Sequence, residues 1–416
     1  MSHSWYKVDN VAKVFLATAT RRDPRVFRVS CTLTEPVDAD TLNEALQRTA
    51  LEWPQFQVTL HRGLFWHYFE ATDQLPTARQ EDKAPCAPLY VRERRNRLIY
   101  RVSYFGARIN LEMFHALTDG NGGFLFLKSI VQNYLALRHP GTLEHLPTPN
   151  SASAGALEQD SFKKFYGGAK GVLPEHLPRS YRLHGGRLPY DQLQYFEGHL
   201  SVRQVLEKSR ELGVSVTSYL GASLMLAIYD EMASMDRAKP ISISIPVNLR
   251  NYYPSETARN FFNSVYVTHT PAPGDTLQTL APVFDEKLKD ALRPEKVKAQ
   301  MDQYEKLEHV PGIRPVPLVI KNWTVRFFSW MERGHVTVVL SNLGRIAVPE
   351  ALEPYIRGFS AFSTSEGMFT CVCSYGDDLV LGTASALRST NVLRQFYSGL
   401  AKNGLQVTLY ATEVQK

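Results

Sequence analysis

The chain has 416 residues, more than one ordinary hydrophobic core organises, so its length predicts two domains. Its 44% hydrophobic and 21% charged residues are typical of a globular protein, and the absence of a bilayer-length apolar run or of an apolar signal segment over residues 1–10 argues against a membrane-spanning or secreted chain. The net charge of +6, with a pI near 9.0, would suit a phosphate-bearing ligand or an acidic partner.

Apolar periodicity in the first half alternates between helical and strand spacing. An amphipathic helix is predicted over residues 39–53, with Asp38 or Asp40 as its N-cap and Trp53-Pro54 at its end. Two β-hairpins, each around a glycine, and a second amphipathic helix follow. Their ranges are 56–60 with 65–69, 98–104 with 109–114, and 124–137 for the helix.

Prolines and glycines recur through residues 139–190, and this segment therefore differs from both of its flanks. Such a density of residues that break helices and strands is typical of a long connection. We expect an N-terminal subdomain over residues 1–175, a C-terminal subdomain over residues 190–416, and a linker over residues 139–190.

Strands and helices resume in the second half. A helix capped near Ser201 is predicted to reach Gly213, and the strongly apolar helix at 218–232 is expected to be buried. The other predicted elements, in chain order, are strands at 240–246 and 261–270, charged helix over 275–309, a strand at 335–340 that stops at Ser341, a hairpin of 368–375 with 379–383, and a last helix at 390–402. Both halves mix strands and helices, so the predicted fold class is α/β with mixed sheets.

Neither the cysteines nor the strongest basic cluster indicates a special class of protein. Cys31, Cys86, Cys371 and Cys373 are too few and too scattered for a disulfide framework, and a C-x-C pair alone does not supply a zinc site. We expect small core cysteines in a reducing cytosol, hence a cytoplasmic protein without a bound metal. The cluster at 92–97 contains an acid and no aromatics, which favours a solvated strand edge over a phosphate-binding patch and argues against nucleic-acid binding.

The most informative motif is H-x-x-x-D-G, formed by His115, Asp119 and Gly120. It lies between the predicted strand at 109–114 and the helix at 124–137, so the histidine is placed at a glycine-rich turn. The unperturbed pKa of histidine lets this side chain act as a base near neutral pH. A lone histidine at a strand end more often satisfies a local hydrogen bond, but the aspartate and the glycines favour a functional role here.

Two further runs at predicted strand ends, Pro246 to Arg250 and Ser341 to Gly344, complete a pattern. In this order, the three runs resemble the condensation-domain and chloramphenicol-acetyltransferase-like (CAT-like) superfamily of CoA- or carrier-dependent acyltransferases. The resemblance covers nearly the whole chain and is strongest for free-standing alcohol acetyltransferases and polyketide-associated acyltransferases. It implies two CAT-like subdomains with an active-site tunnel at their interface and His115 at the midpoint of that tunnel.

The sequence departs from two groups within the superfamily, and these groups are therefore less similar to it. Phe114 stands where peptide-synthesis condensation domains usually carry a first histidine, and the D-F-G-W-G run of plant-type acyltransferases does not occur. The second histidine carries the role of base in the family, so the departure at Phe114 leaves His115 as the implied base.

The chemistry of acyl transfer suggests a role for each charged residue of the pattern. His115 would take the proton of an attacking alcohol or amine and pass it to the leaving thiolate, which is worth roughly 10²–10⁴ in rate. The resemblance implies that Asp119 turns away from the substrate and pairs with an arginine, as a structural brace. Arg250 is the candidate partner through a bidentate contact, with a surface charge near a strand end as the alternative.

The glycines and the second run have expected roles as well. We expect Gly120 at positive φ, and Gly122 and Gly123 where close packing or ligand approach excludes a side chain. Ser341 and Asn342 are candidate hydrogen-bond donors to the tetrahedral oxyanion, worth roughly 3 kcal/mol for one such donor. The alternative for this run is an ordinary turn.

The predicted function is transfer of an acyl group, with acetyl as first choice, from acyl-CoA to a small alcohol or amine. Acyl-CoA would be a co-substrate, and no permanently bound cofactor is expected. One alternative is a carrier-protein-dependent acyltransferase or condensation enzyme, for which an acyl carrier protein would be the partner. Another is a non-catalytic relative that binds a ligand or partner in the same cleft. Aromatic residues at 261–262 and 327–330 are interpreted as core.

Overall fold

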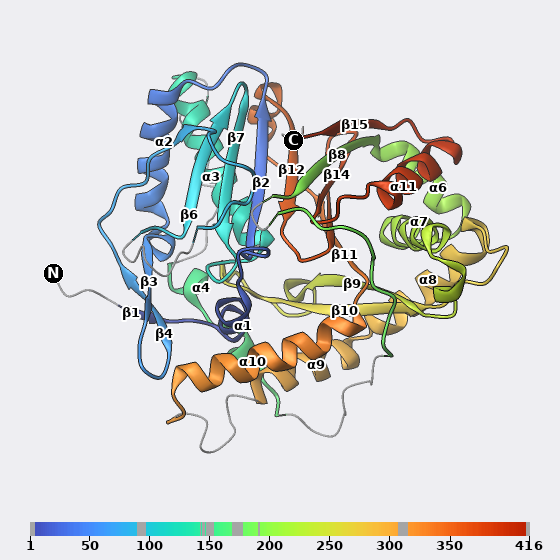
Figure 1. Cartoon of the computed structure of the whole chain (residues 1–416). Coiled ribbons are helices and arrows are strands. Elements are labelled where there is room, and N and C mark those ends of the chain that lie inside the picture. The colour runs from blue at the N-terminus through green and yellow to red at the C-terminus, as the bar shows by residue number, and fades with distance from the viewer. Residues whose placement is uncertain are drawn as a thin grey trace.

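Three β-sheets and the helices around them make up the computed structural model (Figure 1). The structure describes residues 5–89, 97–141, 143, 146, 154–168, 178–189, 192–306 and 315–412. The fold is a mixed α/β fold, as predicted, and two of the sheets hold parallel as well as antiparallel neighbours.

The first sheet has the strand order β12-β2-β7-β6-β5 and carries the H-x-x-x-D-G motif at the end of β7. Its strands are β2 (Val26–Leu33), β5 (Arg79–Gln80), β6 (Tyr100–Phe105), β7 (Arg108–Phe114) and β12 (Ile356–Ser363). Helices α2 (Ala39–Glu52) and α3 (Gly120–Arg138) pack against each other, and α3 also contacts β2 and β7. Their apolar faces and the sheet share one buried core.

The second sheet is larger and has the order β10-β9-β11-β13-β14-β8-β15. Its strands are β8 (Gln194–Ser201), β9 (Ile241–Asn248), β10 (Phe262–His269), β11 (Val338–Arg345), β13 (Met368–Tyr375), β14 (Asp378–Ser385) and β15 (Thr408–Ala411). Helices α6 (Val202–Glu211), α7 (Val216–Glu231), α8 (Leu277–Ala291) and α11 (Asn391–Lys402) form a second core with one face of this sheet. The apolar helix α7 is buried, as predicted.

Strand β12 joins the two halves. It belongs to the second half of the chain, yet it pairs antiparallel with β2 of the first sheet and packs against β13 and β14 of the second. The guanidinium of Arg108, on β7, also donates to both carboxylate oxygens of Glu197, on β8, at 2.9 and 2.8 Å. β12 therefore crosses the division that the sequence predicts at residues 139–190.

The third sheet is small and lies at the edge of the first half, in the order β1-β4-β3. It consists of β1 (Trp5–Lys7), β3 (Val58–Arg62) and β4 (His67–Ala71), and helix α1 (Asn10–Thr18) follows β1. Helix α10 (Leu318–Glu332) runs beneath α1 in Figure 1 and packs against it. The remaining helices are α4 (Ala154–Glu158), α5 (Ser161–Phe165) and α9 (Pro294–Lys306), with 3-10 turns at Pro54–Phe56, Ser234–Asp236, Leu249–Asn251, Arg333–His335 and Glu350–Tyr355.

One predicted helix end is confirmed, and two other element ends differ from the prediction for identifiable reasons. The N-cap of α2 is Asp38, one of the two predicted caps, and its Oδ1 accepts from Thr41 N–H at 2.9 Å. Helix α3 begins at Gly120 rather than residue 124 because Asp119 caps it. Strand β11 does not stop at Ser341: it continues to Arg345, because β13 offers backbone partners along its side. Such pairing depends on a strand that is distant in sequence.

The cysteines and one aromatic run give opposite outcomes. Cys31, Cys86, Cys371 and Cys373 are buried and unpaired, as expected of core cysteines. The aromatic residues at 327–330 are exposed on α10, so their interpretation as core is wrong. Of the basic cluster at 92–97, all but Arg97 lies outside the described residues.

Within the described part of the chain, no single helix is long and apolar enough to cross a membrane. The helices α6 and α7 satisfy the length and composition criteria only as a pair, which is bent by 82°. The same residues contain no group of histidine, cysteine or acidic side chains placed to hold a metal ion.

Candidate active site

His115 lies directly after β7 and is enclosed by aromatic rings. Its backbone N–H donates to the backbone carbonyl of Arg25 at 2.8 Å. The centroid of its imidazole ring lies 4.3, 5.0 and 5.6 Å from the ring centroids of Phe15, Phe27 and Phe262. Burial lowers the pKa of His115 below its ordinary value, because a charged imidazolium loses its hydration there. The neutral ring is therefore favoured near neutral pH, and one of its nitrogens keeps a lone pair.

Asn260 determines which ring nitrogen keeps that lone pair. Its Nδ2 donates to Asp9 Oδ2 at 3.3 Å, and its Oδ1 lies 3.2 Å from His115 Nδ1. An amide oxygen can only accept, so the hydrogen is assigned to Nδ1 and the lone pair to Nε2. This is the tautomer in which Nε2 can take a proton from a substrate.

Asp9 holds the amide of Asn260 in that orientation. Its Oδ1 accepts from Ala12 N–H at 2.7 Å, which caps α1, while Oδ2 receives Asn260 Nδ2. Burial raises the pKa of Asp9 to about 6, so its carboxylate form is lost as the pH falls through that value. Hydrogen bonds from Asn260 to Asp9 and between His115 and Asn260 thus link the start of α1 to the histidine.

Asp119 lies beneath the loop and joins three segments of the chain. Its Oδ1 accepts from Gly122 N–H at 3.1 Å and caps α3, while its Oδ2 accepts from Phe261 N–H at 2.9 Å and from Arg250 Nη1 at 2.8 Å. Both charged side chains are mostly buried. The ion pair with Arg250 is the contact that the sequence suggested, and the cap is a role that the sequence analysis missed.

The contact between Arg250 and Asp119 is not bidentate. Only Nη1 of Arg250 reaches the carboxylate, while Nε and Nη2 donate to Thr257 O at 3.2 and 2.8 Å, and Nη2 also donates to Arg259 O at 2.7 Å. The guanidinium therefore holds this loop by the carbonyl groups of Thr257 and Arg259. Because Asn260 comes next in the chain, this arrangement also fixes the side chain that orients His115.

The glycines of the motif serve packing rather than unusual backbone angles. Gly120 is not among the glycines at positive φ, so that expectation is wrong; a Cβ there would lie 2.8 Å from Leu343 Cδ2. A Cβ on Gly122 would lie 2.6 Å from Ala258 O, and one on Gly123 would lie 2.6 Å from Phe27. The loop is therefore packed against both halves of the molecule.

Gly122→Ala is expected to destabilise the protein by about 1–3 kcal/mol, since the new methyl group meets a backbone carbonyl that cannot move aside. Gly120→Ala should cost less, because the terminal methyl of Leu343 can swing away. Gly399→Ala is the matched control: Gly399 lies inside α11 with open space around it, and the change should be neutral or stabilising. Thermal unfolding of the three variants tests this order, and an unaffected Gly122→Ala variant would contradict it.

Ser341 and Asn342 point to opposite faces of β11, because neighbouring residues of a strand alternate. Asn342 Nδ2 donates to Thr217 Oγ1 at 2.9 Å, and its Oδ1 accepts from Gly344 N–H. Leu343 instead packs on the core of the first half, beside Gly120. Ser341 lies on the same face of β11 as Leu343. The two residues therefore do not converge, and Ser341 is the one on the side of the histidine loop.

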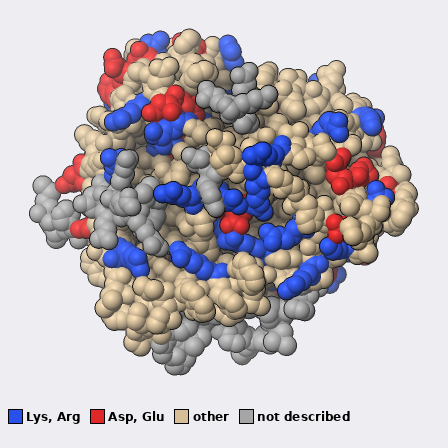
Figure 2. Space-filling view, viewed as in Figure 1, with Lys and Arg blue, Asp and Glu red and all other residues tan. Residues whose placement is uncertain are grey.

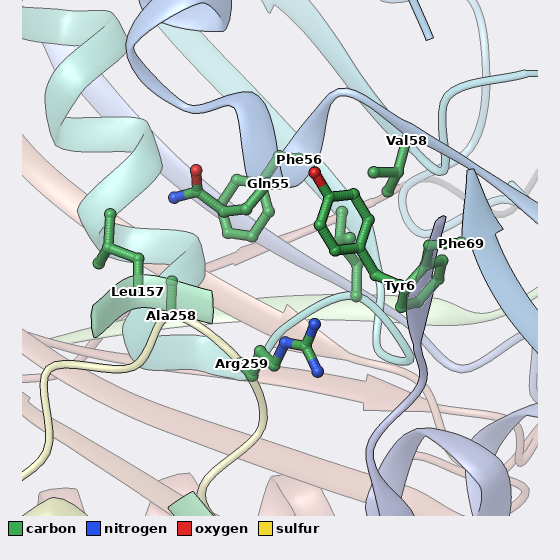
Figure 3. A pocket seen from close by; sticks show the side chains of 9 residues that line it. Tyr6, Gln55, Phe56, Val58, Phe69, Leu157, Ala258 and Arg259 are labelled. Atoms are coloured by element: carbon green, nitrogen blue, oxygen red, sulfur yellow. The ribbon is translucent and has the colours of Figure 1, made fainter. Parts of the chain in front are cut away.

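A pocket lies next to the loop, and His115 is not part of its lining (Figure 3). Its empty volume is about 340 Å³, which includes the open solvent at its mouth. The nine lining residues are Tyr6, Gln55, Phe56, Val58, Phe69, Leu117, Leu157, Ala258 and Arg259. The amide of Gln55 has no hydrogen-bond partner among the described residues. A tunnel that passes His115 stays a prediction.

Five residues near His115 were missed by the sequence analysis: Asp9, Phe15, Arg25, Phe27 and Asn260. Arg25 has a φ of 56°, a left-handed conformation that is uncommon for any residue but glycine, and its carbonyl receives the His115 N–H. No local motif marks these positions, because they come from the first helix, from the start of β2 and from the loop before β10.

The fold as a whole resembles solved structures that include an acetyltransferase. Polyketide synthase associated protein 5 from Mycobacterium tuberculosis aligns at 15% identity over 95% of this chain and 97% of its own, with a TM-score of 0.60. The trichothecene 15-O-acetyltransferase TRI3 from Fusarium sporotrichioides aligns at 10% identity, over 96% and 94%, with a TM-score of 0.62. The chain has the fold of the condensation-domain and CAT-like acyltransferases.

A condensation domain aligns as well. The starter condensation domain of the rhizomide synthetase RzmA, solved with C8-CoA and Leu-SNAC, aligns at 10% identity over 96% of this chain and 93% of its own, with a TM-score of 0.60. No protein-family model matches the sequence, and no curated protein matches it. At identities this low, the likeness establishes the fold alone.

Proposed function

We propose that this chain is an acyltransferase that moves an acyl group, acetyl in the first instance, from a CoA thioester to an alcohol or amine. The observation that carries the proposal is the orientation of His115: Asn260 Oδ1 holds Nδ1–H, so Nε2 keeps its lone pair for a substrate. The CAT-like fold supports the reaction class, since the solved neighbours include an acetyltransferase and a domain crystallised with an acyl-CoA. Acyl-CoA would be a co-substrate rather than a bound cofactor.

In the proposed reaction His115 is the general base. Nε2 takes the proton from the acceptor O–H or N–H as that atom attacks the thioester carbonyl carbon. The tetrahedral oxyanion collapses, the C–S bond breaks, and the leaving thiolate receives the proton from the imidazolium. Ser341 is the candidate donor to the oxyanion, while Asn342 would have to leave Thr217 to take part.

The donor and acceptor classes can be tested directly. The protein is incubated with acetyl-CoA and a panel of small alcohols and amines, and the release of free thiol is followed. Thiol release that depends on both the protein and one acceptor class supports the proposal. Failure across acyl chain lengths and acceptors, beside tight binding of a ligand in the same cleft, would instead support a non-catalytic relative.

A carrier-protein donor is the second candidate. The likeness to a starter condensation domain favours it, and so does the surface: Figure 2 shows lysine and arginine side chains spread across the centre of one face. An acidic acyl carrier protein would complement the net charge of +6. Activity with an acyl carrier protein and none with acyl-CoA would select this alternative. A cytoplasmic location stays a prediction from the sequence.

Asn260→Leu is expected to lower kcat by up to roughly 100-fold while KM changes little, because the ring of His115 would lose its fixed orientation. The bond from Nδ1–H to Asn260 is stronger for the imidazolium, so its loss should lower the pKa of His115 further. The acidic limb of the pH–rate profile should therefore lie at lower pH in the variant than in the wild type.

Asn263→Leu is the control for that experiment. Asn263 is buried three residues further on and bonds Val297 O and Gln300 instead of the histidine. This variant should alter stability but leave the acidic limb in place. An Asn260→Leu variant with unchanged kcat and an unchanged limb would refute the positioning role.

A further inference from the structure

Helix α10 presents its apolar side chains to solvent. Seven large apolar residues on it are each at least 46% exposed: Val319, Ile320, Trp323, Phe327, Phe328, Trp330 and Met331. Leu318 is the only buried residue that the helix contributes. A surface helix ordinarily turns its apolar stripe toward the core, so this arrangement is inverted.

The face of α10 that meets the protein is instead mostly polar, with Lys321, Asn322 and Ser329 beside the apolar residue Val325. The less exposed positions after Leu318 are 321, 322, 325 and 329, which recur at helical spacing on one side. Lys321 Nζ donates to Phe65 O at 3.2 Å, and Arg326 Nε donates to Ala17 O at 2.5 Å. These bonds to backbone carbonyls fix the helix with its aromatic stripe outward.

A second element extends the apolar surface. The tip of the β3–β4 hairpin exposes Leu64 and Trp66, and Leu64 O accepts from Leu318 N–H at the start of α10 at 2.9 Å. Helix and hairpin tip lie side by side along the lower edge in Figure 1. We call the exposed residues of α10 together with Leu64 and Trp66 the aromatic face.

The charges around the aromatic face are mainly positive. Arg326 is exposed beside the stripe and, within the described part of the chain, is bonded only through Nε. Lys321 lies half-buried at the face that meets the protein, and the helix has one acid, Glu332, near its end. Among the described residues Arg326 forms no ion pair with a carboxylate. Figure 2 shows the lower edge as mostly uncharged surface, with blue side chains above it. Exposed tryptophan and phenylalanine beside lysine and arginine are the composition of helices that lie in a lipid headgroup layer.

We propose that the aromatic face binds the surface of an anionic lipid membrane. With 15 residues, α10 would lie flat in the interface rather than cross it, since its length is about 22 Å. The exposed Arg326 would meet lipid phosphates, and the aromatic rings would meet the acyl boundary. The opposite side of α10 is linked to the histidine through α1, because α10 packs on α1 and the ring centroid of Phe15 on α1 lies 4.3 Å from that of His115. The proposal does not depend on the acyl-transfer reaction.

Vesicle sedimentation tests the proposal with the full-length protein. Wild type should bind vesicles of phosphatidylcholine and phosphatidylserine, bind pure phosphatidylcholine less, and bind more weakly as salt rises. The double variant Trp323→Ser/Trp330→Ser should partition at least about tenfold less, because two large rings lose their contact with lipid. Circular dichroism shows whether this variant keeps its fold.

The double variant Leu51→Ser/Met235→Ser is the matched control, since both side chains are apolar and at least 80% exposed but lie outside the aromatic face. It should bind vesicles like the wild type. The proposal would be overturned if the wild-type protein did not bind anionic vesicles, or if both double variants bound them equally well. It would also be overturned if the wild-type protein formed a dimer, did not bind vesicles, and became monomeric in the tryptophan variant. The aromatic face would then be a contact between copies of the chain.

Discussion

His115→Ala should lower the rate of acyl transfer by roughly 10²–10⁴-fold, the range expected when a positioned general base is lost. The alanine cannot accept the proton of the acceptor, and the surrounding rings of Phe15, Phe27 and Phe262 carry no group that could replace the imidazole as a base. Thiol release from acyl-CoA with the best acceptor measures the loss. The pH–rate profile of the wild type should also fall on the acid side below the ordinary histidine pKa, roughly 6.5, because burial lowers the pKa of His115.

His184→Ala provides the control for the loss of an imidazole. The His184 side chain is 65% exposed, so its removal should leave both activity and stability unchanged. A His115→Ala protein that keeps the wild-type rate would show that this histidine is not the base. A protein that loses activity together with its fold would be replaced by His115→Gln, which retains a polar side chain of similar reach.

The parts of the site that could be predicted from the sequence are residues that lie close together in one short run or belong to a pattern shared with a known family. His115 and Asp119 are four residues apart at a strand-to-helix turn, so their separation follows from local backbone geometry. Arg250 could be paired with Asp119 only through the resemblance of the three runs, and the detail of that contact was wrong. Its guanidinium is shared between one carboxylate oxygen and backbone carbonyls, which depend on how residues 257–259 fold.

The remaining parts depend on contacts between distant segments. Asn260 is 145 residues from His115, and Asp9 is 251 residues from Asn260. The continuation of β11 past Ser341 needs β13 beside it, and that continuation turns Asn342 away from the loop. The aromatic run at 327–330 shows a different limit: apolar composition suggests that the residues are buried, but it does not say which way they face, and here they face solvent.

Asp119→Ala should lower the free energy of unfolding by about 3–5 kcal/mol, because it leaves the buried guanidinium of Arg250 without its counter-charge. The same change removes the cap of α3 and the acceptor for Phe261 N–H. Asp119→Asn keeps an oxygen for the cap but not the charge, so it should cost less than Asp119→Ala. Urea denaturation measures both variants.

Asp38→Ala is the control that separates the contribution of a helix cap from that of the ion pair between Asp119 and Arg250. Asp38 caps α2 as Asp119 caps α3, but it is exposed and forms no ion pair with a described residue, so its loss should cost only about 1 kcal/mol. The excess for Asp119 then measures what the contacts with Arg250 and Phe261 contribute. If Asp119→Ala costs no more than Asp38→Ala, the brace is wrong. If Asp119→Asn is as stable as the wild type yet inactive, the carboxylate acts in the chemistry. A joint loss of stability and activity is the expected result, since Asp119 and Arg250 hold the loop that carries Asn260 to His115.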